Sequence, residues 1–284
     1  MIIERSPRIS EATIYSGFDT FTRTLLNFWK TVIIKIDDGS TTKSAIDDIN
    51  QSLGATNAII LFDHHYAFDA IPITFALGKV LRNVSGVVIP YAVHLDMALD
   101  PDGFPSPRYK IRTLAFHRLV GTIQEMNPTI RFYPVVREFE RENLRLNAVV
   151  EAEFRGANTR YLKGLLQVFY ENPAGQLCIL SPVSGIAFPH KPVLHTQVYR
   201  SLEAVQQKCG QAFPFYFVGG YPHLKYDLHY LAPLLTKHTV VARGPFYLPM
   251  GNYDKASAVV RSHLLDLRQA ANFATPDYAR IEHK

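Results

Sequence analysis

The alternation of short apolar segments with helical patterns constrains the fold of this chain more than any other feature. An apolar run from Ile59 to Phe62 indicates a buried strand, and a helix is predicted over residues 70–83 directly after it. Further strands are predicted at residues 85–95, 130–137, 175–182, 213–220 and 238–248. Further helices are predicted at residues 19–35, 43–53, 111–126, 139–151, 157–172, 198–209 and 253–272. This alternation predicts an α/β fold with a single, largely parallel (mixed) sheet flanked by helices.

The domain organisation predicted from the sequence is simple. No low-complexity linker and no shift in composition marks a boundary, so residues 1–284 are predicted to form one domain. Its N-terminal part, about residues 1–55, is expected to be a helical segment. A Pro-rich stretch at about residues 96–110 is expected to be an insertion loop.

Composition narrows the classes of partner. With 47% hydrophobic residues the chain can bury a substantial core. The net charge of +5 favours anionic partners such as phosphate esters, coenzyme A or an acidic membrane surface. Nucleic acid is not predicted as a partner, because no concentrated Lys/Arg stripe accompanies that charge. The two cysteines lack CxxC spacing and predict neither a zinc site nor a disulfide framework, which favours the cytoplasm.

Membrane and export signals are not expected from the sequence. The N-terminus "MIIERSPRIS" carries charge where a signal peptide would need an apolar core. No window reaches the roughly 18 apolar residues of a membrane-spanning helix. Any contact with a membrane is therefore expected to be peripheral.

A cluster of titratable residues follows the first predicted strand, in the segment "NAIILFDHHYAFDAIP". Asp63, His64, His65 and Asp69 lie within seven positions. Three interpretations of the cluster stay open. In the simplest, these residues only shape a loop, and Asp69 caps the helix that follows it.

The second interpretation is a metal site in which Asp63 and His64 bind a metal pair, as in phosphoesterases with an Asp-His-His triplet. The upstream acids occur as adjacent pairs rather than in the alternating pattern that such a site needs, and no metal site is predicted. The third interpretation is a proton-transfer pair. His64 at a strand end and Asp69 at the start of the next helix can fold back onto each other, so that the carboxylate orients the imidazole as a general base.

The segment "IILFDHHYAFDAIP" resembles the first motif of the glycerolipid acyltransferase family, in which Asn-His, four residues and Asp follow a hydrophobic strand. His64 and Asp69 match its two chemical positions, and Asp63 stands where Asn is usual. "RFYPVVR" resembles the second motif, whose arginine would be Arg137. "LKGLLQVFYENPAGQLCILSP" resembles the helix and strand that lead into the third motif, "AFPFYFVGG" the fourth, and "TVVARGPFYLP" the C-terminal strand.

The chain departs from the family at the third motif, Phe-Pro-Glu-Gly-Thr-Arg. Here the segment is "SPVSGIAFPHK", in which Pro182 fits but Val183 replaces the glutamate. Ser184 and Gly185 take the following positions and could offer a hydroxyl and backbone N–H groups. Because this motif shapes the acceptor site in the family, a phosphorylated acceptor is in doubt.

The resemblance implies an enzyme that transfers a fatty acyl group from acyl-CoA or acyl carrier protein to a hydroxyl of a glycerolipid or polyol. His64 would be the general base, Asp69 would orient it, and Arg137, Pro182, Ser184 and Gly185 would bind substrate. No metal or organic cofactor is implied beyond the thioester co-substrate. A cytoplasmic location is expected, with peripheral attachment to the inner face of a membrane left open. The alternatives are a metal-dependent phosphoesterase and a non-catalytic, lipid-binding member of the fold.

Overall fold

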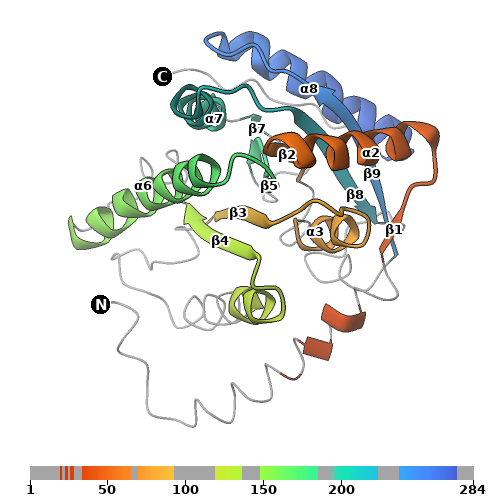
Figure 1. Cartoon of the computed structure of the whole chain (residues 1–284), viewed down its shortest axis with the longest axis horizontal. Coiled ribbons are helices and arrows are strands. Elements are labelled where there is room, and N and C mark those ends of the chain that lie inside the picture. Colours follow the sequence, from red (N-terminus) through yellow and green to blue (C-terminus); the bar gives the residue numbers. More distant parts are fainter. Residues whose placement is uncertain are drawn as a thin grey trace.

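The computed structural model describes residues 20, 23–24, 26–28, 34–64, 70–92, 119–135, 148–184, 193–194, 196–222 and 237–273. Within these residues, seven strands form one sheet in the order β1-β9-β8-β2-β5-β3-β4 (Figure 1). They are β1 (Ile34–Ile36), β2 (Ala58–Asp63), β3 (Gly86–Ala92), β4 (Ile130–Val135), β5 (Gln176–Leu180), β8 (Phe215–Pro222) and β9 (His238–Phe246). The short strands β6 (Val183–Ser184) and β7 (Val193–Leu194) form a separate antiparallel pair.

The large sheet is mostly parallel. Strands β8, β2, β5, β3 and β4 run in one direction, and β9 pairs with β8 in the antiparallel sense. Strand β1 runs parallel to β9 at the far edge of the sheet. The predicted α/β fold with a largely parallel mixed sheet is therefore confirmed.

Helices cover both faces of the sheet. They are α2 (Ser40–Ala55), α3 (Ala70–Gly78), α6 (Ala148–Glu171), α7 (Thr196–Cys209) and α8 (Tyr253–Ala270), together with a helix described over residues 119–126. Apolar side chains of α2, α3 and the 119–126 helix pack on one face, and those of α6, α7 and α8 pack on the other. Figure 1 shows α6, α7 and α8 on the side of the sheet opposite α3. No helix in the described part of the chain is long and apolar enough to cross a lipid bilayer.

The central strand β2 is buried along its whole length. Its side chains alternate between the two faces, with Ile60 and Phe62 in the core under α3 and Ile59 and Leu61 in the core under α7 and α8. A strand covered on both faces needs apolar residues at every position, which explains the continuous run in the sequence.

Asn57 holds the amino end of β2. This fully buried side chain donates hydrogen bonds to the carbonyl oxygens of Phe169, at 3.1 Å, and Asn172, at 2.7 Å. Its own oxygen accepts a bond from the Gln176 amide at 2.9 Å. One amide side chain thus ties β2 to the end of α6 and the start of β5.

The predicted and observed helices differ most in two regions of the chain. The helix predicted over residues 19–35 is wrong at its carboxyl end, because Ile34–Ile36 forms β1 and pairs with His238–Val240 of β9. The apolar spacing of this segment is compatible with a helix or with a strand. Pairing with β9, 204 positions away in the chain, selects the strand. The helices predicted at 139–151 and 157–172 also merge in part, since α6 runs unbroken from Ala148 to Glu171. A single glycine such as Gly156 costs only about 1 kcal/mol in a helix and does not end it.

His263 of α8 lies in an aromatic cluster between helix and sheet. Its ring centroid is 3.7 Å from that of Phe246 and 4.8 Å from that of Phe217. Its buried Nδ1 has no hydrogen-bond partner among the described residues, and the Asp266 Oδ2 atom is 3.8 Å away. Burial lowers the pKa of His263 below its ordinary value of 6.5; nearby Asp266 opposes this shift, and Arg243 adds to it.

This environment predicts a loss of stability in mild acid. The folded protein binds the His263 proton less readily than the unfolded chain, so the unfolded state binds more protons below about pH 6.5. The stabilising effect is complete above that pH and is lost as the pH falls toward the folded-state pKa. We expect His263→Phe to lose less of its thermal midpoint than the wild type between about pH 7.5 and about pH 5.5. Equal acid losses in the two proteins would contradict this assignment.

Candidate functional site

The carboxyl ends of three neighbouring parallel strands meet at one edge of the sheet. β2 ends at Asp63 and is followed by His64, β5 ends at Leu180 and is followed by Pro182, and β8 ends at Pro222. Since β2 is the middle strand of the three, His64 lies at the centre of this edge.

The chain changes direction at this edge. After β2 the next helix, α3, packs on one face of the sheet, and after β5 the next helix, α7, packs on the other. β2 and β5 are hydrogen-bonded neighbours, and the helices that follow them lie on opposite faces of the sheet. In open α/β sheets such a point leaves a crevice beyond the strand ends, and ligands bind there.

His64 occupies this position as a partly exposed residue. Its side chain is half-buried, and its imidazole meets Phe62 edge-on, with ring centroids 5.8 Å apart and an interplanar angle of 89°. Phe62 belongs to the core on the α3 face, and α3 begins at Ala70 on that same face. The imidazole therefore packs against an aromatic neighbour, and the residue as a whole is not fully buried.

The other predicted site residues are described only in part. Pro182 is buried just after β5, so the structure brings it to the same edge as His64. Ser184 ends the short strand β6, and its backbone pairs with Val193 of β7. Asp69, Arg137 and Gly185 lie outside the described residues.

The strand before Arg137 lies some way from β2. β4 ends at Val135 and is separated from β2 by β5 and β3. Three steps at the usual strand spacing place the two backbones about 14 Å apart. A group bound at the end of β4 is therefore distant from one that reacts at the end of β2.

Asp63 has a definite structural role, which sequence reasoning missed. The carboxylate is fully buried and accepts two hydrogen bonds from Arg268, from Nε to Oδ2 at 2.6 Å and from Nη2 to Oδ1 at 2.9 Å. The Tyr221 hydroxyl donates a third to Oδ2 at 3.1 Å. Asp63 thus faces α8, on the side of the sheet opposite Phe62 and α3.

A signal for this pair was present in the sequence. Both faces of β2 carry apolar side chains, which predicts that both faces are buried. Asp63 shares a face with Ile59 and Leu61, and a carboxylate on a buried face needs a cationic partner. Arg268 lies on the buried stripe of α8 with Leu264 and Leu267, where a charged residue is otherwise out of place. These two charged residues at otherwise apolar positions are each other's partner.

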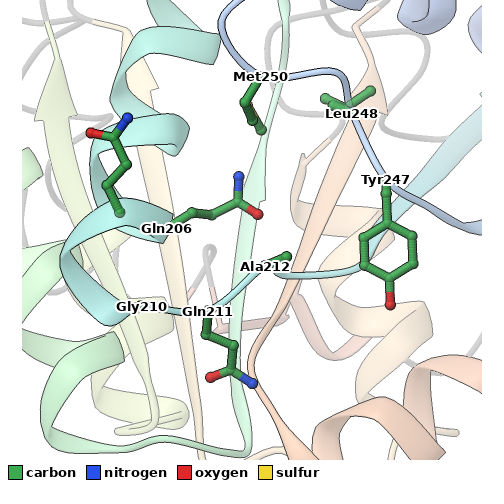
Figure 2. A pocket seen from close by; sticks show the side chains of 8 residues that line it. Gln206, Gly210, Gln211, Ala212, Tyr247, Leu248 and Met250 are labelled. Atoms are coloured by element: carbon green, nitrogen blue, oxygen red, sulfur yellow. The ribbon is translucent and has the colours of Figure 1, made fainter.

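A pocket of about 330 Å³ lies elsewhere in the fold (Figure 2). Gln206 and Gln211 line it from the end of α7 and the segment after it, and Tyr247 and Met250 line it from the segment after β9. Because these segments adjoin the start of β8, the pocket is at the opposite edge of the sheet from His64. It therefore contributes nothing to the His64 site.

Comparisons with known proteins add no family assignment. Among the described residues, no group of three or more His, Cys, Asp or Glu side chains is arranged to hold a metal ion. A scan against models of protein families finds none that matches this chain, and a search of curated proteins finds no match either. What is shown is an α/β fold with a partly exposed histidine at the carboxyl end of its central strand.

Proposed function

We propose that the protein is an O-acyltransferase of the glycerolipid acyltransferase type. It would transfer a fatty acyl group from acyl-CoA or acyl carrier protein to a hydroxyl of a glycerolipid or related acceptor. One observation carries the proposal: the partly exposed residue His64 lies at the carboxyl end of β2, where the helices that follow the neighbouring strands β2 and β5 pack on opposite faces of the sheet. The histidine of the motif that the sequence resembles thus lies where ligands commonly bind in open α/β sheets, which supports the proposal.

His64 acts as the general base in this proposal. It takes the proton from the acceptor hydroxyl as that oxygen attacks the thioester carbonyl, and Asp69 holds the other imidazole nitrogen and stabilises the imidazolium. The tetrahedral intermediate collapses with loss of the C–S bond, and the imidazolium returns the proton to the departing thiolate. An ester and a free thiol result, so no covalent enzyme intermediate is required.

The oxyanion of the intermediate needs hydrogen-bond donors. The first N–H groups of a helix have no partner within the helix and favour negative charge. α3 packs on the same face of the sheet as Phe62, which His64 contacts, so we assign these donors to the N–H groups at the start of α3 other than that of Pro72, which has none.

Substrate binding in this proposal uses groups at several strand ends. Pro182, Ser184 and Gly185 follow β5 and shape the acceptor site. Arg137 follows β4 and binds an anionic group of the acceptor or of the thioester carrier. Since β4 is about 14 Å from β2, that group is remote from the reacting carbonyl. The net charge of +5 suits such substrates and peripheral contact with the inner face of a membrane.

The phosphoesterase alternative has less support from the described residues. Both Asp63 oxygens are hydrogen-bonded to Arg268, on the opposite face from Phe62, which His64 contacts. Asp63 would have to give up those bonds to bind a metal ion together with His64.

The test is an acyl-transfer assay on the purified full chain. Labelled long-chain acyl-CoA is incubated with glycerol 3-phosphate, lysophosphatidate and non-phosphorylated alcohols, with and without a chelator. We expect an esterified product with at least one acceptor and the same rate with the chelator present. Chelator-sensitive release of phosphate would favour the phosphoesterase. Lipid binding without turnover, with acyl-CoA and acyl carrier protein both tried as donors, would favour the non-catalytic alternative.

A further inference from the structure

We propose that Arg268, acting through Asp63, is a positioning residue for His64. The inference rests on the proposed function, because it assigns Arg268 a part in placing the general base. It starts from the contact next to His64. The residue directly before His64 is the buried carboxylate Asp63, and its partner Arg268 comes from α8, 205 positions away in the chain.

The pairing of β2 with its two neighbours extends to different lengths toward His64. On the β5 side, the pairing extends from Ala58 to Leu61 and ends there. On the β8 side it continues to Asp63, which pairs with Gly219. The register with β8 therefore reaches the residue directly before His64.

The Asp63 side chain adds a restraint of its own to the strand end. Arg268 engages both carboxylate oxygens through its planar fork, which fixes orientation as well as distance. The Tyr221 hydroxyl binds one of the same oxygens from β8. With three hydrogen bonds from two elements, the carboxylate and the backbone that carries it have little freedom to rotate.

Two neighbouring residues, Gly219 and Phe273, also favour this contact. Gly219 is the strand partner of Asp63, and a Cβ atom at that position would overlap the Tyr221 ring. A side chain there would push the Tyr221 hydroxyl away from Asp63. Phe273 lies against both donors, with its ring centroid 5.1 Å from that of Tyr221 and 5.8 Å from the Arg268 guanidinium carbon. Asp63, Arg268 and Tyr221 are all buried, and burial strengthens hydrogen bonds between them.

Stability alone is a weak reason for such a pair. Burying two charges costs about as much as their attraction returns, and apolar residues of similar volume do as well or better. What an apolar pair cannot do is fix the direction of the strand end. Asp63 is joined directly to His64, so a fixed strand end also fixes where the imidazole begins.

The experiment compares three variants of the full chain. Arg268→Lys keeps the charge but loses the planar fork, and Tyr221→Phe removes one hydrogen bond while keeping the ring. Asn57→Ala is the matched control, because it loosens β2 at its other end, away from His64. We expect Arg268→Lys to lower kcat for acyl transfer about 10- to 100-fold, the effect of a displacement of about 1 Å, with KM for acyl-CoA nearly unchanged. Tyr221→Phe should lower kcat less, and Asn57→Ala should not lower it even where it lowers the unfolding midpoint as much.

A second readout does not require activity. The ring signals of ¹⁵N-labelled histidines are compared in the same variants, and the His64 signal is identified by its loss in His64→Ala. We expect Arg268→Lys and Tyr221→Phe to move the His64 signal and Asn57→Ala to leave it in place. If Arg268→Lys does not fold, Tyr221→Phe carries the test.

The outcomes separate this inference from the proposed function. Wild-type kcat and an unmoved His64 signal in a folded Arg268→Lys, or in Tyr221→Phe if that variant carries the test, would overturn the positioning role and leave acyl transfer standing. A wild type without acyl-transfer activity would count against the proposed function. A His64 signal that moves in Arg268→Lys but not in Asn57→Ala would still support the positioning role in that case.

Discussion

Replacing His64 with alanine is expected to lower kcat for acyl transfer about 10²- to 10⁴-fold, the usual contribution of a general base. The acceptor hydroxyl would have to lose its proton to water, which is a far weaker base than imidazole. His64 is half-buried at the end of a strand, outside the two apolar cores, so the fold should survive the change. Initial rates with labelled acyl-CoA and unfolding curves on the same preparations measure both effects.

The neighbouring histidine provides the matched control for this prediction. His65→Ala changes the same residue type one position further along the chain, and His65 has no assigned chemical role. We expect it to retain most of the wild-type kcat. If His64→Ala turns over acyl-CoA as fast as His65→Ala, the base has been assigned to the wrong residue. Asp69→Asn should fall between the two, because the imidazole remains but loses the carboxylate that orients it.

Replacing Asp63 with alanine is expected to cost about 3–5 kcal/mol in the free energy of unfolding. The variant leaves the Arg268 guanidinium buried without its carboxylate and removes the acceptor of the Tyr221 hydroxyl bond. Removing one member of a buried pair exposes the full desolvation cost of the other. Urea unfolding monitored by circular dichroism gives the value from the midpoint and slope.

Two comparisons make this result specific to the buried pair. Asp38 is an exposed carboxylate that contacts Lys35 at 3.3 Å, and Asp38→Ala should leave the unfolding midpoint unchanged. The double change Asp63→Leu with Arg268→Met should recover much of the loss, because well-packed apolar residues can replace a buried ion pair. An Asp63→Ala protein as stable as Asp38→Ala would show that the pair contributes nothing to folding.

Much of the secondary structure could be predicted because its signals are local. The apolar runs of β2 and β5 are bounded by polar residues, and both strands occur where those runs predict them. The amphipathic spacing of α8 likewise placed that helix within a few residues of its ends. The prediction failed at Ile34–Ile36, where the local spacing permits a helix or a strand and only the exposed edge of β9 selects the strand.

The candidate site also has a part that could be predicted from neighbouring residues and a part that could not. His64 could be singled out from its neighbours in the chain, because a histidine behind a buried strand and a nearby carboxylate form a local pattern. The role of Asp63 could not be found from that pattern, in which it was either a metal ligand of the phosphoesterase alternative or a departure from the usual asparagine. Its partner on α8 became evident once the direction of its side chain was known.

By itself, the sequence determined the class of fold, the strand that carries His64 and the motif that suggests acyl transfer, since all three depend on residues close together in the chain. Only the tertiary structure decided that β2 lies between β5 and β8, that the chain leaves β2 and β5 toward opposite faces, and that Asp63 is bound by Arg268. The physical reason is that a buried charge needs an opposite charge and the edge of a strand needs hydrogen-bond partners. The packing of distant segments determines which residues fill these roles. Arg268 meets Asp63 because α8 covers the face toward which that carboxylate points.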